Sequence, residues 1–112
     1  MDHKMKLNPN AFQGVKDGKQ KWETRLLDEQ RKEIKVGDTI TFYKLPDKDE
    51  ILTTKVAKIL TAKNFSELFT KFDPKEANWP ESYTIEDCAK SMEKYYSLDR
   101  QNESGVVAFA LK

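Results

Sequence analysis

The stretch "GKQKWETR", residues 18–25, decides how the rest of the chain is interpreted. Its glycine suits a turn, and "KWETRLL" reads as a β-strand, in which successive side chains point to opposite faces. One face of this strand would carry a base, an acid and a base in a row, namely Lys21, Glu23 and Arg25. The other face would carry Trp22, Thr24 and Leu26. Half-buried strands rarely align charges in this way, so the charged face is the first candidate for a functional site.

Length and composition limit the class of protein. The chain has 112 residues, of which 38% are hydrophobic and 35% are charged, and we expect one domain over residues 1–112. No apolar run approaches the roughly 18 residues of a membrane span, and no signal-peptide pattern opens the chain. The one cysteine, Cys88, excludes an internal disulfide and suits a reducing compartment. We therefore expect a cytoplasmic protein that contacts no membrane and has no obligatory protein partner.

Charge and the supply of metal ligands narrow the chemistry further. The net charge is +1, so overall charge predicts no nucleic-acid partner. Residues 1–36 nevertheless hold nine Lys/Arg against six Asp/Glu, whereas residues 73–103 hold four against eight, which is compatible with a basic groove. The one histidine, His3, lies near an end that we expect to fray, and it and Cys88 are too few for a zinc site or a catalytic triad. We expect no metal and no cofactor.

Apolar periodicity predicts an α+β fold. Strands are expected at residues 21–27, 39–45, 51–62 and 105–112. Helices are expected at residues 9–17, 64–72 and 84–95, with a helical turn at 28–34. The final strand, "GVVAFALK", is apolar on both faces, which indicates a central position in its sheet. Because strands follow one another without strict β-α-β alternation, we expect a small, curved sheet or barrel.

The order of five stretches makes the chain resemble the ASCH domain family of the PUA-like superfamily, in particular its small single-domain bacterial-type members. They extend over about residues 8 to 111 and are "GKQKWETR", "LLDEQRKEIKVGDTITF", "FSELF", "MEKYYS" and "GVVAFAL". The resemblance implies a PUA-like curved β-sheet or small β-barrel with flanking helices. The family signature is Gly-x-Lys-x-x-Glu-x-Arg, and three of its positions are matched, by Gly18, Glu23 and Arg25. Gln20 stands at the position of the signature lysine.

The resemblance implies a function in binding RNA or a nucleoside or nucleotide, including one with a modified base. It also implies an alternative, because some small members resemble amidohydrolases of the N4-acetylcytidine type. In those proteins the signature lysine is the nucleophile or activated amine, beside a hydroxyl residue and a glutamate. Here Gln20 replaces the lysine, Glu23 stands where the hydroxyl is expected, and Glu81 falls near the glutamate. Because a glutamine cannot act as a nucleophilic amine, this hydrolysis is not expected to carry over intact.

Three interpretations of the charged face remain open at the level of sequence. In the first, Glu23 and Arg25 form an ion pair at a solvated barrel rim, contributing about 0–1 kcal/mol. In the second, Arg25 binds a phosphate or carboxylate in a cleft, and aromatic side chains supply a stacking surface for a base; these are Trp22, Trp79 and Tyr96. In the third, the face is catalytic and hydrolyses an acylated nucleoside or RNA.

Candidate residues follow from these interpretations. The expected ligand-binding residues are Gly18, Lys19, Gln20, Lys21, Glu23, Arg25, Arg31, Trp79 and Tyr96. If the protein is an enzyme, which the sequence leaves open, the candidate catalytic residues are Lys21, Glu23 and Glu81. For two of these residues a structural role is the simpler expectation: a salt bridge from Arg31 to Asp28, and a cover over the core for Trp79. A scaffold that contacts only other proteins would be indicated by a large exposed apolar patch.

Overall fold

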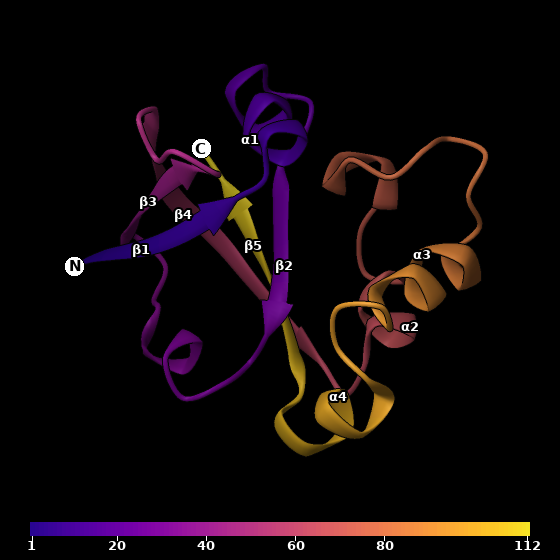
Figure 1. Ribbon diagram of the computed structural model, residues 1–112. Helices are drawn as coiled ribbons and strands as arrows, with labels where there is room; N and C mark the ends of the chain where they lie inside the picture. Colours follow the sequence, from indigo (N-terminus) through magenta and orange to yellow (C-terminus); the bar gives the residue numbers. More distant parts are fainter.

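The computed structural model describes residues 1–112 and contains one five-stranded sheet that curls into a half-barrel (Figure 1). The strands lie in the order β1-β3-β4-β5-β2. Their bounds are Asp2–Leu7 (β1), Trp22–Leu26 (β2), Thr39–Lys44 (β3), Ile51–Ala62 (β4) and Val106–Leu111 (β5). β1 runs parallel to β3, and the other neighbouring strands are antiparallel. β1 and β2 are therefore the two edges of the sheet.

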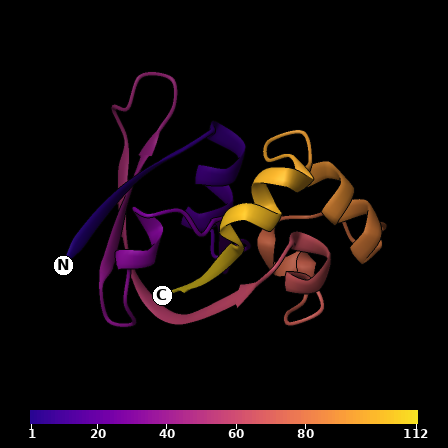
Figure 2. The same cartoon turned by 90° about the horizontal axis from the view of Figure 1, so that it is seen from below.

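Four α-helices and two 3₁₀ turns flank the sheet. Their bounds are Pro9–Lys16 (α1), Phe65–Leu68 (α2), Ile85–Met92 (α3), Leu98–Ser104 (α4), Arg31–Glu33 (η1) and Pro74–Ala77 (η2). α1 connects the two edge strands. α2, α3 and α4 lie together beyond β2, away from the rest of the sheet (Figures 1 and 2). None of these helices has the length and apolar character needed to cross a membrane.

β5 separates two hydrophobic cores, because both of its faces are apolar. Val107 and Phe109 pack into the first core, with side chains from α1, β1, β3 and β4. Val106 and Ala108 pack into the second core, with side chains from α2 and α3. All four side chains are fully buried. β5 lies between β4 and β2, which confirms the interior position predicted from its two apolar faces.

The structure confirms the predicted α+β class and small curved sheet, and it contains all four predicted strands. The helices expected at 64–72 and 84–95 are shorter than predicted, because the chain leaves α2 at Leu68 and α3 at Met92 and continues in turns. Cys88 lies buried in the second core.

One α-helix and one β-strand were missed, as was the short 3₁₀ turn η2. α4 has the polar sequence "LDRQNES" and lacks an apolar stripe, so periodicity gave no signal for it. Gln101 is its one buried residue, and the side-chain amide joins α2 to the turn after α3: Oε1 accepts from Phe65 N at 3.1 Å, and Nε2 donates to Tyr96 O at 2.8 Å. The second missed element is β1, which occupies the end that was expected to fray.

β1 is fixed at its start by Asp38, in the turn before β3. His3 Nε2 lies 2.8 Å from Asp38 Oδ2, and Asp38 Oδ2 also accepts from the backbone N–H of Lys35 at 3.0 Å. These bonds, that of His3 first, lower the pKa of Asp38 from 3.8 to about 2. The His3 side chain is only 12% exposed. The expectation of a frayed end is wrong, because this polar cluster and the pairing with β3 hold the segment in place.

Replacement of Asp38 by Asn is expected to make the free energy of unfolding less dependent on pH below about pH 4. A carboxyl group whose folded-state pKa is lowered stabilises the fold above its unfolded pKa of 3.8, and this contribution is lost as the pH falls towards about 2. The free energy of unfolding, measured by urea titration between about pH 2 and about pH 6, should fall more steeply below about pH 4 in the wild type than in D38N. Asp47→Asn, at an exposed carboxyl group without an ion pair, is the matched control. Equal slopes in the wild type, D38N and the control would contradict the assignment.

Candidate functional site

The charged face of β2 points into the half-barrel. Glu23 is paired across the strands with Phe109, and Arg25 with Val107, so both charged side chains share the face of the first core. The side chain of Glu23 is only 8% exposed and that of Arg25 only 16%. Glu23 and Arg25 do form the predicted ion pair, but the prediction that it lies at a solvated rim is wrong, because the curl of the sheet encloses it.

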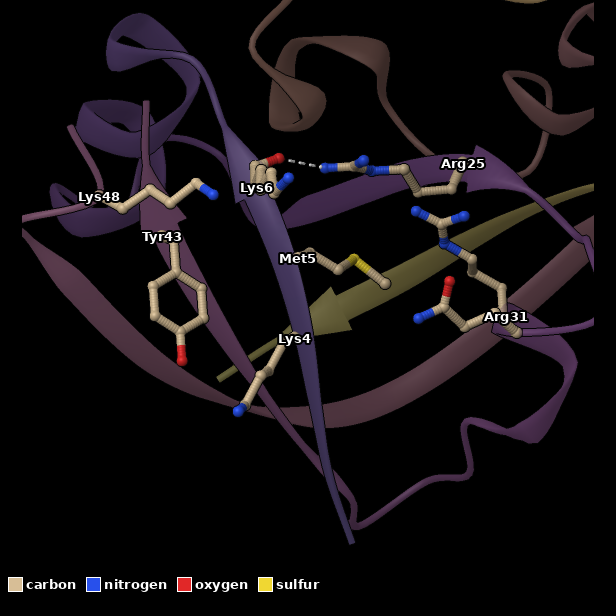
Figure 3. Close-up of a pocket in the computed structure, with 8 residues that line it drawn as sticks. Lys4, Met5, Lys6, Arg25, Arg31, Tyr43 and Lys48 are labelled. Atoms are coloured by element: carbon tan, nitrogen blue, oxygen red, sulfur yellow. Dashed lines mark hydrogen bonds between the residues drawn. The ribbon is translucent and has the colours of Figure 1, made fainter. Parts of the chain in front are cut away.

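Arg25 bridges the two edges of the sheet. Its Nε and Nη2 donate to Glu23 Oε2 at 3.2 and 2.8 Å, and Nη2 also donates to the carbonyl of Lys6 in β1 at 2.9 Å (Figure 3). Burial by itself lowers the pKa of Arg25, but the Glu23 carboxylate more than offsets this, and the Tyr96 hydroxyl adds to the effect, so that the pKa is raised. The guanidinium therefore remains charged beside its carboxylate and ties β2 to β1.

Gln20, at the position of the signature lysine, completes this polar group. The residue is 5% exposed, and its Nε2 donates to Glu23 Oε1 at 3.0 Å and to the carbonyl of Trp22 at 3.3 Å. Its backbone N–H donates to the carbonyl of Gly14 in α1 at 2.9 Å. A Cβ atom at Gly14 would lie 3.3 Å from Gln20 Cβ and 3.3 Å from Asn78 Nδ2, so the glycine allows α1 to pack closely against this site.

A cleft of about 360 Å³ opens beside these buried groups, between the edge strands and the C-terminal helices. Five of the nine expected ligand-binding residues line it, and they come from three separate segments of the chain. They are Gln20, Glu23, Arg25, Trp79 and Tyr96. The structure therefore contains a cleft beside Arg25, as the second interpretation of the charged face expects.

The aromatic side chains of the cleft differ in how much of each ring is packed against other side chains and how much is exposed. Trp79 stacks on Tyr83, with ring centroids 6.0 Å apart, and contacts Phe69 edge-on at 6.2 Å. Tyr96 stacks on Phe65 at 6.1 Å. Both rings therefore cover the second core as well as lining the cleft. Tyr95, which was not among the candidates, lines the same cleft and is 65% exposed.

Other candidates lie outside the cleft. Gly18 and Lys19 are exposed in the turn after α1. Lys21 precedes β2, and its Nζ lies 3.6 Å from Glu76 Oε2. Glu81 is 87% exposed, 3.7 Å from Lys75 Nζ. The structure therefore does not bring the candidate catalytic residues Lys21 and Glu81 together with Glu23.

Trp22 and Arg31 also lie away from the cleft. Trp22 is on the opposite face of β2 and stacks on Phe72, with centroids 4.7 Å apart, so the expectation that it offers a stacking surface to a ligand is wrong. Arg31 Nη1 forms the expected salt bridge, 2.6 Å from Asp28 Oδ2. Arg31 lines a second pocket, on the β1 side of Arg25.

Sequence reasoning missed several polar residues that line the cleft, among them Lys6, Asn10, Asn78 and Tyr95. Lys6 belongs to the strand that was not predicted. Asn78 adopts a left-handed backbone conformation, with φ of 71°, and carries the chain from η2 to Trp79. The tyrosine pair in "KYYS" was the one available signal, since of two adjacent side chains only one, here Tyr96, can pack against the core, and its neighbour Tyr95 stays exposed. No three His, Cys, Asp or Glu side chains are arranged to hold a metal ion.

Comparisons with known proteins agree with this architecture. A family model described as the ASCH domain matches residues 5–111. The crystal structure of a hypothetical protein designated PH0355 superimposes with a TM-score of 0.87 at 32% identity, covering 100% of this chain and 98% of that chain. The solution structure of protein PF0455 from Pyrococcus furiosus superimposes with a TM-score of 0.76 at 28% identity, covering 100% of this chain and 96% of that chain.

A third solved structure is less similar to this chain. The ASCH crystal structure from Zymomonas mobilis superimposes with a TM-score of 0.68 at 15% identity, covering 99% of this chain and 66% of that chain, a likeness that shows the fold alone. The search of curated proteins found no match.

A curled half-barrel with a cleft between its edge strands and a group of helices defines an α+β protein of PUA-like fold. Of the signature residues, Glu23 and Arg25 stand on β2, which lines this cleft, and Gly18 stands in the turn that precedes it. Since the family model extends over nearly the whole sequence, the chain belongs to the ASCH domain family. The resemblance inferred from the sequence is confirmed.

Replacement of Glu23 by Gln tests the structural part played by the ion pair. The variant leaves the largely buried Arg25 without a carboxylate, and removal of one partner from a fully buried pair costs about 3–5 kcal/mol. Because Arg25 keeps some contact with water, we expect the free energy of unfolding to fall by about 2–3 kcal/mol in urea titrations. Glu76→Gln, in the exposed pair with Lys21, is the control and should cost less than about 1 kcal/mol. Equal losses in the two variants would contradict a special role for the Glu23–Arg25 pair.

Proposed function

We propose that this ASCH domain, acting as a single domain over residues 1–112, binds RNA or a nucleoside or nucleotide with the base in the cleft. The observation that carries the proposal is the combination of a buried, hydrogen-bonding polar group and an exposed aromatic ring in one cleft, formed by Glu23, Arg25 and Tyr95. Nucleic-acid bases are recognised in this way, by hydrogen bonds to their edges and by stacking on aromatic side chains. The family relationship supports the same class of ligand.

The polar groups retain capacity for a ligand. A carboxylate offers about four lone-pair sites, and Glu23 uses three, for Gln20 Nε2 and for Nε and Nη2 of Arg25. Its remaining site can accept a hydrogen bond from the amino group of a base. Nη1 of Arg25 donates none of the hydrogen bonds to Glu23 or to the Lys6 carbonyl, so its N–H groups can be donated to an oxygen of the ligand, in competition with the Tyr96 hydroxyl beside the guanidinium.

No observation favours hydrolysis of an acylated nucleoside or of RNA. The amide of Gln20 replaces the amine that the lysine-dependent reaction uses, and its nitrogen is occupied in holding Glu23. Lys21 and Glu81 lie outside the cleft. We therefore propose a binding protein, located in the cytoplasm, where the unpaired thiol of Cys88 would stay reduced.

Replacement of Tyr95 by Ala is expected to weaken ligand binding without weakening the fold. Stacking of a base on an aromatic side chain is worth about 1–3 kcal/mol, so the dissociation constant for a short single-stranded RNA should rise by about fivefold or more. Binding is measured by titration of isotope-labelled protein, with chemical shifts followed at Gln20, Thr24 and Asn78. Ile51→Ala, an exposed apolar residue outside the cleft, is the control. Shifts confined to residues away from the cleft would overturn the proposed function.

Incubation with N4-acetylcytidine distinguishes binding from hydrolysis. We expect the wild type and Gln20→Lys to leave the acetyl group in place, because position 23, where the hydroxyl is expected, would still be a glutamate, and no second glutamate lines the cleft. The product, free cytidine, is followed by chromatography. Release of cytidine by the wild type would overturn the proposal of a binding protein. Release by Gln20→Lys alone would show that the rest of the reaction machinery is in place, contrary to the positions of Lys21 and Glu81.

A further inference from the structure

A second pocket, of about 610 Å³, lies on the β1 side of Arg25 and is lined mainly by cations (Figure 3). Five of its eight lining residues carry positive charge: Lys4, Lys6, Arg25, Arg31 and Lys48. The other three are uncharged, and no carboxylate is among them. We refer to this site as the basic pocket. In a protein with a net charge of only +1, such a concentration of one sign of charge requires an explanation.

The cations of the basic pocket come from separate elements that the fold brings together. Lys4 and Lys6 project from β1, Arg31 from η1, and Lys48 from the hairpin between β3 and β4. Figure 3 shows the guanidinium of Arg31 directed towards Arg25 on one side of β1, with Lys4 and Lys48 on the other side. The arrangement is therefore a product of tertiary structure and not of a basic run in the sequence.

Much of this charge is not neutralised by the protein. Lys4, Lys6 and Lys48 take part in none of the salt bridges within 4.0 Å, whereas Arg25 and Arg31 each have one carboxylate partner. Like charges brought together in a hollow repel one another and create a positive potential that attracts anions. An anionic group in the pocket would relieve this repulsion.

The basic pocket is continuous with the cleft through two shared residues, Lys6 and Arg25. Arg25 stands at this common wall, and its Nη2 is held by the Lys6 carbonyl whereas its Nη1 takes no part in that bond. A ligand with its base in the cleft would therefore have its phosphate within reach of a guanidinium fork, which suits a phosphate through paired N–H donors.

We propose that the basic pocket binds a phosphate group of the ligand whose base lies in the cleft, so that the ligand is a nucleotide or an oligonucleotide and not a free nucleoside. This inference rests on the proposed function, because the cleft fixes where the base lies. The tyrosine of β3 in the pocket, Tyr43, can add a hydroxyl donor to the same phosphate. A charged hydrogen bond from Arg25 and a positive field from the lysines then favour the phosphorylated ligand by at least about tenfold.

The test compares nucleosides, their 5′-monophosphates and a short RNA, with the double variant K4Q/K48Q and the control K55Q/K58Q. Both double variants remove two exposed lysines that have no salt bridge, so they change the net charge equally. We expect monophosphates to bind the wild type at least about tenfold more tightly than nucleosides. K4Q/K48Q should lose most of that gain while nucleoside affinity stays the same, and K55Q/K58Q should retain it. For the RNA, the logarithmic salt slope should become shallower by about 0.7 for each phosphate that K4Q/K48Q no longer binds.

The outcomes separate this inference from the proposed function. If nucleosides bind in the cleft and the phosphate adds no affinity, or if K55Q/K58Q loses as much as K4Q/K48Q, the basic pocket is not the phosphate site and the proposed function stands. If no nucleoside, monophosphate or RNA shifts the resonances of the cleft, the proposed function and this inference both fail. Inorganic phosphate, titrated alone, should shift residues of β1 and of the β3–β4 hairpin; shifts elsewhere would count against the pocket.

Discussion

The hydrogen bonds of Arg25 to Glu23 and to the Lys6 carbonyl are the interaction on which the rest of this structure depends. The sheet ends at β1 on one side and β2 on the other, and no backbone ladder joins these edges. Along β1 the carbonyls alternate in direction: that of Leu7 accepts from Leu45 N next to β3, and that of Lys6 is turned towards β2. Arg25 on β2 supplies a donor to this carbonyl, because its long side chain spans the gap between the two edges.

This constraint explains why a strand that faces a hydrophobic core carries charge. A lone guanidinium inside the half-barrel would be costly, so it needs a carboxylate beside it, and that carboxylate needs its own donors. Glu23 and Gln20 meet these two requirements in turn. With a lysine at position 20 the group would hold two cations and one anion. With glutamine it is neutral, so the cleft offers hydrogen bonds for recognition while the positive field comes from the basic pocket next to it.

The parts of this fold that the sequence predicted are those in which apolar periodicity and pairing agree. β5 is the clearest case, because two apolar faces can be satisfied only by a core on each side. The position of Glu23 and Arg25 on one face followed from strand alternation alone. Lys21 was predicted on the same face but does not join Glu23 and Arg25 at the site. It precedes β2, and its backbone N–H is bonded to the Glu76 carbonyl in η2. β1 was missed because its register and direction are set by a parallel partner far along the chain, which no local pattern encodes.

The lysines of β1 could be explained in another way, as charges that protect an exposed edge strand from pairing with other chains. That explanation accounts for Lys4 and Lys6, which belong to the edge strand itself. It does not account for Lys48, which belongs to a hairpin, or for Arg31, which belongs to a 3₁₀ turn. Edge protection requires charge along one strand, whereas phosphate binding requires charge from several directions around one hollow. The convergence of four separate elements on the basic pocket, with β2 contributing Arg25, meets the second requirement.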